Sequence, residues 1–584
     1  SSFKNEVPFF AGLKVFDRKG KEGKANESII KKLIEVKALL ARGKLKHAYP
    51  HSWRSKAPVI FRNTPQWFVN IDRKLNDGMD DYGDTIRKRA LSSIDQLVKW
   101  TPRTGRNRLF SMIETRPDWV LSRQRAWGVP LSCFVRKGRT PQDNDFILID
   151  SKVNERIIEV FKEEGADSWF APDAKKRFLL GLYNPEDYEQ IFDILDVWFD
   201  SGSTHAFVLR DRSDGFWPAD LYLEGTDQHR GWFHSSLLQA CGTRGQAPYK
   251  GVLTHGFALD ENGMKMSKSL GNTVSPENVI NQYGADILRL WVAQSDYSTD
   301  LRIGPEILKG VSDSYRRLRN TLRFLLGSLS GYDERKEKVS FSEMPELEQW
   351  VLHRLSELDM VVKKGYEDYS FQAVFQQLFQ FCTQDLSSIY FDIRKDCLYC
   401  DSYINHTRRA ARTVLDKIFY RLSSWLAPVL VFTTEEVWLE RFKDFNSSIH
   451  LQDIPANSEE WYNPELGMKW ENIFQVRRVV TGAIEIERQN KVIGSSLESA
   501  PEVYISNANL YEVIKSVNFA EICITSDLVL KKQKTQRISF SLPDVKDVEV
   551  IFKAAGGCKC ERCWKYVENL NSGICIRCES VLSS

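Results

Sequence analysis

Residues 252–272 have the sequence VLTHGFALDENGMKMSKSLGN, a short apolar run followed by a loop rich in lysine and serine. The run Val252–Leu259 predicts a β-strand, and Glu261-Asn262-Gly263 predicts a tight turn directly after it. Around this stretch, from Tyr49 to about Gly304, short apolar runs alternate with helical stretches. Such alternation favours an α/β fold built on a sheet.

After Pro305 the pattern changes to helices. Apolar residues at spacings of three and four predict one helix through Val311–Leu329 and a second through Leu347–Val362. Two more helices are expected at Phe371–Phe391 and Arg408–Leu426. Together they predict a helical bundle that extends to about residue 480.

Both ends of the chain have a different character. Near the N-terminus, a helix capped by Asn26 and ended by Gly43 is expected. After the bundle, short alternating runs such as Glu502–Ile505 predict a small mixed α/β domain, and the last 30 residues form a cysteine cluster. The expected division is 1–45, 46–304, 305–480, 481–552 and 553–584.

The composition excludes several classes of protein. The chain has 584 residues, enough for about four domains of roughly 150 residues each. No run of 18 apolar residues occurs, which argues against a membrane span, and Ser1–Val7 lacks the apolar core of a signal peptide. The net charge is only +3, so any basic surface for a nucleic acid must be local.

The loop at Lys265-Met-Ser-Lys268-Ser carries two lysines and two hydroxyls next to the predicted turn. Such a loop suits a pyrophosphate, because leaving phosphates need cations at the transition state, and one well-placed donor contributes about 10²–10³ in rate. A solvated basic loop is the alternative that the five residues alone leave open.

A second polar segment, Tyr222-Leu-Glu224-Gly225-Thr-Asp227-Gln228-His-Arg-Gly-Trp232-Phe, lies upstream. Its carboxylates and amide could contact an ammonium group and ribose hydroxyls, and its glycine lets a ligand approach the backbone. Polar turns at strand ends are common, so the segment is a weak signal by itself.

Several motifs together resemble one family. Lys265–Ser269 matches the KMSKS signature of the class I aminoacyl-tRNA synthetases letter for letter, and Thr254–Phe257 and Tyr283–Asp286 resemble its flanks. The segments that resemble the isoleucine, leucine and valine subgroup are Arg116–Trp119, Ser122–Arg125, Trp127–Pro130 and Asp196–Gly202. The Glu224–Phe233 block, with His51–Arg62 and Thr64–Phe68, resembles the bacterial-type isoleucyl-tRNA synthetases more than the valine or leucine enzymes.

The resemblance implies a fold class for each segment. Residues 1–45 resemble the closing part of an editing insertion, and 46–304 resemble part of a Rossmann-like, nucleotide-binding catalytic α/β domain. Residues 305–480 then correspond to an α-helical anticodon-binding bundle, 481–552 to a small mixed α/β junction domain and 553–584 to a zinc module. The resemblance is weakest between about 430 and 550.

The family also implies an activity and its residues. The reaction is ATP-dependent activation of L-isoleucine to an adenylate and transfer to tRNA(Ile), with Mg²⁺ accompanying ATP. Lys268 would contact the ATP phosphates with help from Lys265, and Trp198 and Trp232 would wall the isoleucine pocket. The residues expected near the adenylate are Glu224, Gly225, Asp227, Gln228 and Gly256. Because the chain has 16 tryptophans, plain core positions remain an equal alternative for the two named here.

Five of the 11 cysteines lie in the last 27 residues. Cys560-x-x-Cys563 and Cys575-x-x-Cys578 predict one structural, tetrahedral Zn²⁺ site, because so short a tail has too little core to fold without a metal. Cys558 offers a competing register, and an unmetallated reduced tail is the other alternative. The basic residues expected to suit RNA phosphates around this site are Lys559, Arg562, Lys565 and Arg577.

Two further features have weaker support. Cys397-x-x-Cys400 could indicate redox chemistry, but no thioredoxin-like context surrounds it. A helix with Arg316, Arg317, Arg319 and Arg323 could face tRNA, and a solvated charged face is an equal alternative.

Class I synthetases also carry a His-x-Gly-His signature, and no such run occurs in this chain. We therefore expect a fragment, cytoplasmic and monomeric, that needs a complementary N-terminal part for activity. The alternative is a non-catalytic tRNA-binding product of a truncated or split synthetase.

Overall fold

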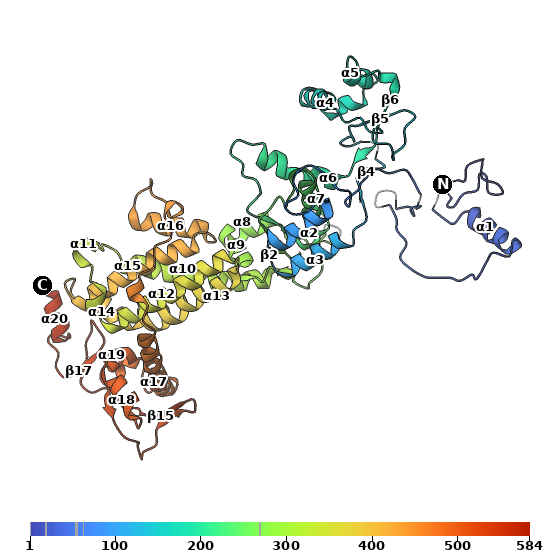
Figure 1. Cartoon of the computed structure of the whole chain (residues 1–584). Coiled ribbons are helices and arrows are strands. Elements are labelled where there is room, and N and C mark those ends of the chain that lie inside the picture. The colour runs from blue at the N-terminus through green and yellow to red at the C-terminus, as the bar shows by residue number, and fades with distance from the viewer. Residues whose placement is uncertain are drawn as a thin grey trace. The chain divides into compact units, whose positions relative to one another are not determined.

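The computed structural model describes residues 2–17, 20–52, 56–61, 63–125, 127–267 and 270–583, which fall into two compact units. The first unit comprises residues 1–97, 109–219 and 230–248, and the second comprises 98–108, 220–229 and 249–584. Figure 1 shows the chain and labels many of its helices and some of its strands. No helix in these described ranges has the length and the apolar character needed to span a membrane.

The core of the first unit is a helical layer. Helix α7 (Trp232–Arg244) packs against α2 (Ile86–Gln96) and α6 (Val197–Gly202). The Ser236 hydroxyl donates to the carbonyl of Gly202 at 3.1 Å, and the buried Arg89 donates to the carbonyl of Cys241 at 3.1 Å. These bonds fix α7 to both neighbours.

Short antiparallel pairs connect this layer to a small lobe. Strand β1 (Phe68–Val69) pairs with β3 (Trp119–Val120), and β4 (Ser122–Arg123) pairs with β7 (Ile194–Leu195). The lobe itself pairs β5 (Phe134–Arg136) with β6 (Tyr188–Gln190) and packs them on α4 (Ser151–Glu164) and α5 (Ala174–Leu179). Its core is aromatic, and Trp169 stacks on Phe178 at 5.4 Å.

The N-terminal helix is shorter than its sequence predicted. Helix α1 is Lys24–Glu35, and its cap is Gly23, because the side chain of Asn26 donates to Glu22 instead. The helix ends where Lys37 adopts a positive φ of 54° and the Ala38 amide donates to the carbonyl of Leu33. The prediction that it reaches Leu40 and Gly43 was wrong, since Leu40 is fully exposed and packs on nothing that could extend the apolar stripe.

The second unit begins with a three-stranded parallel sheet. Its order is β2 (Lys99–Thr101), β9 (Gly251–His255) and β8 (Tyr222–Gly225), and α3 (Thr104–Glu114) follows β2. The single strand predicted over 252–259 is in fact two strands. Strand β10 (Ala258–Asp260) leaves the sheet at Gly256 to pair in parallel with β11 (Leu301–Ile303).

Helices then dominate. Helices α8 (Pro276–Tyr283) and α9 (Ala285–Gln294) precede the predicted bundle. The bundle helices are α10 (Pro305–Ser328), α11 (Glu334–Glu337), α12 (Glu346–Glu367), α13 (Phe371–Gln380), α14 (Phe391–Cys400), α15 (His406–Leu426), α16 (Val431–Phe442) and α17 (Pro464–Gln489). A π-helical segment, Phe381–Tyr390, joins α13 to α14, so the helix predicted to end near Phe391 continues to Cys400. Helix α17 runs through residue 480, the expected end of the bundle.

The C-terminal part is a small sheet and a cysteine module. The sheet has the order β13 (Val529–Lys531), β12 (Glu502–Ile505), β15 (Val545–Ile551) and β14 (Phe540–Leu542), with α18 (Ala508–Lys515) and α19 (Phe519–Cys523). It packs on α17 through β15. The module contains β16 (Cys558–Lys559), β17 (Tyr566–Val567) and α20 (Ile576–Leu582).

Candidate active site and cysteine cluster

The carboxyl ends of β8 and β9 lie side by side in the second unit. Glu224 is in register with Thr254, and Gly225 is in register with His255. The imidazole Nε2 of His255 lies 4.0 Å from Oε1 of Glu224, and both side chains are partly exposed. Ligands of open α/β sheets bind outside the carboxyl ends of the strands, so this edge is the place to expect a polar ligand.

Two glycines keep this edge free of side chains. A Cβ on Gly225 would lie 2.8 Å from Oδ1 of Asp227. A Cβ on Gly256 would lie 2.1 Å from the carbonyl oxygen of Thr299, a backbone atom that cannot turn away. Gly256 also donates to the carbonyl of Tyr297 at 2.9 Å, which holds β9 close to the segment that precedes β11.

The turn after β8 is fixed by a histidine. His229 is buried, its Nδ1 lies 2.8 Å from the carbonyl of Thr226, and its ring stacks on Trp100. Burial lowers the pKa of His229, so the ring stays neutral and serves as an anchor. The same turn exposes Asp227, which accepts a hydrogen bond from Gln228 Nε2 at 3.0 Å.

The lysine–serine loop is held at its base by two side chains. Asp260 accepts hydrogen bonds from the amides of Asn262 and Met264 and from Asn272 Nδ2 at 2.8 Å. The hydrogen bond from Asn272 keeps the pKa of Asp260 below its usual value. Asn272 Oδ1 accepts from the backbone amide of Ser267 at 2.9 Å, and Asn272 Nδ2 also donates to the carbonyl of Lys265. The Lys265 side chain is exposed, whereas Lys268 lies outside the described residues.

Two tryptophans belong to the α6–α7 pair of the first unit. Trp198 lies on α6 with 41% of its surface exposed. Trp232 begins α7, and its Nε1 donates to the carbonyl of Ser201 and the hydroxyl of Thr204, both at 3.0 Å. Trp232 is therefore fixed to the carboxyl end of α6.

The four cysteines of the doubled motif come together. The thiols of Cys560, Cys563, Cys575 and Cys578 are buried, and their sulfur atoms all lie within 4.8 Å of one another. The Sγ atoms of Cys563 and Cys575 are 3.8 Å apart, far longer than a disulfide of about 2.05 Å. Tetrahedral Zn–S bonds of about 2.3 Å place neighbouring sulfurs about 3.8 Å apart, so the cluster is consistent with a structural zinc site. Cys558 is exposed and does not belong to it.

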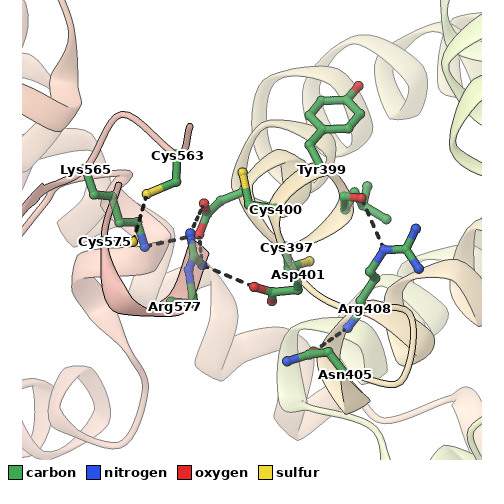
Figure 2. Close-up of polar contacts among 12 residues, drawn as sticks. Cys397, Tyr399, Cys400, Asp401, Asn405, Arg408, Cys563, Lys565, Cys575 and Arg577 are labelled. Carbon is green, nitrogen blue, oxygen red and sulfur yellow. Dashed lines mark hydrogen bonds and ion pairs between the residues drawn. The ribbon is translucent and has the colours of Figure 1, made fainter. Parts of the chain in front are cut away.

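Basic residues of the module turn toward the bundle, as Figure 2 shows for Lys565 and Arg577. Arg577 forms two hydrogen bonds of 2.7 Å with Asp396 of α14 and lies 3.3 Å from Asp401. Lys565 pairs with Asp396 at 3.2 Å, and Arg562 donates to the carbonyl of Cys400 at 2.6 Å. These three residues were expected to suit phosphates, but they dock the module within the chain.

The second CxxC motif, Cys397 and Cys400, consists of two buried thiols whose pKa values are raised by burial, the opposite of a reactive redox pair. Both thiols are free and lie on α14, where Cys397 Sγ bonds to the carbonyl of Arg394. Cys400 packs against the four-cysteine cluster. Burial raises the pKa of the Cys397 thiol, which makes it unreactive.

The arginines predicted on the first bundle helix are exposed on α10. Arg316 pairs with Asp313 at 3.2 Å and Arg319 pairs with Glu436 at 3.4 Å, while Arg317 lies over the ring of Phe379. Surface pairs of this kind contribute little to stability, so these cations could exchange their partners for phosphates.

Comparisons with known proteins identify the family. Residues 12–304 match the family described as tRNA synthetases class I (I, L, M and V), which is half of the chain. The chain belongs to the class I tRNA synthetases. Residues 348–505 of this synthetase chain match the anticodon-binding domain of tRNA ligases.

The curated relatives of this synthetase chain are longer. An isoleucine–tRNA ligase of Ruegeria pomeroyi is 60% identical over 587 residues, covering 100% of the chain and 60% of that protein. The isoleucine–tRNA ligase of Brucella abortus is 53% identical over 559 residues, covering 96% of the chain and 56% of that protein. The chain thus spans about 60% of the length of these relatives. Among solved structures, a Mycobacterium tuberculosis methionyl-tRNA synthetase aligns at 17% identity and a TM-score of 0.43, covering 71% of this chain and 72% of that one.

The structure distributes the expected site residues of this synthetase over both units. The second unit holds Glu224, Gly225, Asp227, Gln228, Gly256, Lys265 and the four cysteines, and the first unit holds Trp198 and Trp232. Sequence reasoning missed His229, Asp260 and Asn272, which position the turn and the loop. The Asp260-x-Asn262-Gly263 turn was a usable signal for Asp260, because Asp side chains commonly bond to backbone amides two residues on.

Proposed function

We propose that this chain is part of an isoleucine–tRNA ligase, which activates L-isoleucine with ATP and transfers it to tRNA(Ile). The observation that carries the proposal is the 60% identity, over the whole chain, to a protein of that name. The side-by-side strand ends with Glu224, Gly225 and Gly256 support it, because they offer an open, polar edge for an aminoacyl-adenylate.

The adenylate residues divide their tasks by chemistry. Glu224 is an exposed carboxylate that would bind the ammonium group of isoleucine, with Asp227 and Gln228 directed to ribose hydroxyls. Gly225 and Gly256 would let the adenylate approach the backbone. Trp198 and Trp232 would form the apolar wall for the isoleucine side chain, which fits their attachment to the single α6–α7 pair.

Lys265 and Lys268 would neutralise the charge that develops on the leaving pyrophosphate. The proposal fits the exposed position of Lys265 at the base of a loop fixed by Asp260 and Asn272. Mg²⁺ bound with ATP would supply further charge neutralisation at the same phosphates.

The cysteine cluster would hold one structural Zn²⁺ through Cys560, Cys563, Cys575 and Cys578. Their burial and sulfur spacing fit a tetrahedral four-thiolate site. The metal would supply the folding free energy that a module of about 30 residues lacks.

The remaining parts are assigned by position. Residues 305–480 would bind the anticodon arm of tRNA(Ile), using exposed cations such as Arg316 and Arg319. Residues 1–45 would belong to an editing insertion and 481–552 to a junction domain, in a cytoplasmic monomer. The chain would complete its ATP site with the portion that its longer relatives have in addition.

The proposed activity is tested by isoleucine-dependent exchange of pyrophosphate into ATP. The chain is assayed alone and with the portion of the Ruegeria pomeroyi relative that it does not cover added in trans. We expect exchange only in the mixture, and none with valine at equal concentration. If neither the chain alone nor the mixture shows exchange while tRNA still binds, the chain acts as an RNA-binding protein. That outcome would contradict the ligase proposal.

A further inference from the structure

A cavity in the first unit carries charged groups that the proposed function does not use, although Trp198, assigned above to the isoleucine pocket, is part of its lining. Its volume is about 360 Å³, and it lies where the residues around β3 meet α6 and α7. The side chains that matter here are Arg116, Asp118, Asp196, Trp198, Arg230 and His234. All of them belong to the first unit.

Arg116 is the unusual member of this lining. Its Nε is shielded from solvent and has no hydrogen-bond partner, and its guanidinium forms no ion pair with the described residues. Arg116 is partly buried, and this burial lowers the pKa of its guanidinium more than the carboxylate of Asp196 raises it. A shielded N–H group of a cation that has no hydrogen-bond acceptor is costly, so an acceptor supplied by a ligand would stabilise Arg116 in this position.

The acidic residues of the cavity are already engaged. Asp196 is buried and binds Arg123 Nη2 at 2.7 Å. Asp118 is on the rim, where its Oδ1 accepts the Ile71 amide at 3.2 Å. Arg230 adds an exposed cation at the mouth. The lining therefore has two aspartates and three arginines, namely Arg116, Arg123 and Arg230. One positive charge of the cavity has no counter-charge in the lining.

We propose that this cavity binds a phosphate group of a nucleotide, with Arg116 as its direct ligand and Arg230 as a second. The guanidinium presents a planar fork of N–H donors that matches phosphate oxygens, and its Nε would gain the acceptor that the described residues do not provide. The inference deepens the proposed function, since that reaction has two sources of nucleotide phosphate, ATP and the RNA strand of tRNA.

Arg116→Gln tests the site, because it removes the charge and keeps a polar side chain. The matched control is Arg73→Gln, an exposed arginine of the same unit that has no ion pair with the described residues. Binding to the full chain is measured with two probes at low and physiological salt. One probe is ATP, followed by calorimetry, and the other is a labelled single-stranded RNA octamer, followed by fluorescence anisotropy.

We expect Arg116→Gln to weaken binding of one probe about tenfold, as loss of a charge-assisted contact does, and Arg73→Gln to change it less than twofold. Weaker binding of ATP alone assigns the site to the nucleotide substrate, and weaker binding of RNA alone assigns it to the tRNA strand. Arg116→Lys, which keeps the charge without the fork, should recover part of the affinity.

Stability separates this role from a structural one. Removal of an unpaired, partly buried cation should leave the melting temperature unchanged or raise it. A lower melting temperature for Arg116→Gln would make Arg116 a structural residue and overturn the proposal. Equal binding by Arg116→Gln and Arg73→Gln, or no binding of either probe by the unmodified chain, would overturn it as well. The pyrophosphate exchange described above tests the ligase activity separately, so the two proposals can fail independently.

Discussion

At the scale of single residues, Gly256 has little freedom to change. A methyl group there would lie 2.1 Å from the carbonyl oxygen and 2.3 Å from the carbonyl carbon of Thr299, and neither atom can rotate out of the way. We expect Gly256→Ala to lower the free energy of unfolding by about 1–3 kcal/mol, as overpacking does, measured by urea denaturation. Gly310→Ala is the control, because its methyl would meet nothing within 4 Å inside α10, and it should stabilise the helix by up to about 1 kcal/mol. Equal stability of the two variants would contradict the packing seen at Gly256.

His205 gives the first unit a dependence on pH. It is buried, and its Nδ1 accepts a hydrogen bond from Trp217 Nε1 at 3.1 Å, which requires a neutral ring. Burial lowers the pKa of His205 from 6.5 to about 4. Between these values the unfolded chain binds a proton and the folded chain does not. The stability that His205 permits is therefore complete above pH 6.5 and is lost as the pH falls toward 4.

The corresponding variant is His205→Asn, whose side-chain oxygen can still accept from Trp217. As the pH is lowered from 6 to 4.5, we expect the free energy of unfolding to decrease more steeply in the unmodified chain than in the variant. The two slopes should differ by about 1.4 kcal/mol per pH unit. Urea denaturation at pH 7.0, 6.0, 5.0 and 4.5 measures both slopes, and the other titrating groups cancel in the difference. Parallel curves would show that His205 is protonated in the folded state.

At the scale of helices and strands, Asp286 connects two elements distant in the sequence. It lies on α9, is buried, and accepts hydrogen bonds from the amide and hydroxyl of Thr433 at 2.8 and 2.6 Å. Thr433 is in the first turn of α16, so Asp286 caps that helix from outside. Helix α9, which is separated from the lysine–serine loop by α8, is thereby fixed to the bundle.

We expect Asp286→Ala to lower the stability by about 1–2 kcal/mol, because it leaves the first amides of α16 without an acceptor. Asp286→Asn keeps one acceptor oxygen, so its stability should lie between that of Asp286→Ala and that of the unmodified chain. Thermal unfolding of the three proteins provides the measurement. If Asp286→Ala and the unmodified chain have the same melting temperature, water must accept hydrogen bonds from the first amides of α16 as well as Asp286 does.

Some helices and strands could be predicted from the sequence, and others could not. The periodic apolar residues of α10 and α12 predicted both helices, because a helix buried on one face must repeat every three or four residues. The break of the predicted strand at Gly256 could not be foreseen, since it depends on pairing between β10 and β11, 43 residues apart in register. The π-helical segment before α14 has no local signature either, and α1 ended early because its extension had no partner surface. The cysteine spacing predicted which thiols cluster, whereas the docking of their basic neighbours required the position of α14.

At the scale of the whole molecule, the second unit joins three of its parts through α14. Arg394 binds Glu348 of α12 through two hydrogen bonds of 2.6 Å and Glu521 of α19 through a third of the same length. Two residues later, Asp396 binds Arg577 and Lys565 of the cysteine module. The bundle, the small sheet domain and the module therefore share one helix as their common support.

Removal of the metal should therefore unfold the cysteine module before any other part of the second unit. Chelation of zinc from the chain is expected to unfold residues 558–582 and to leave the bundle intact, because the bundle core does not include the four cysteines of the cluster. Native mass spectrometry gives the zinc content, which we expect to be one ion per chain, and hydrogen exchange gives the protection of each segment. Loss of protection in α15 together with the module would contradict independent folding of the bundle.

The salt bridge at Asp396 makes a different prediction, because it docks the module without contributing to the thiol cluster. In Asp396→Asn, zinc should remain bound, while hydrogen exchange within Cys558–Leu582 should become about tenfold faster, as expected when a partly buried charge contact of about 1.4 kcal/mol is lost. Asp392→Asn, which removes an exposed pair with Lys395 on the same helix, is the matched control and should change neither property. Release of zinc from Asp396→Asn would mean that docking and metal binding form one cooperative unit. Unchanged exchange would mean that the contacts of Arg562 with the carbonyls of Cys400 and Tyr399 suffice to hold the module.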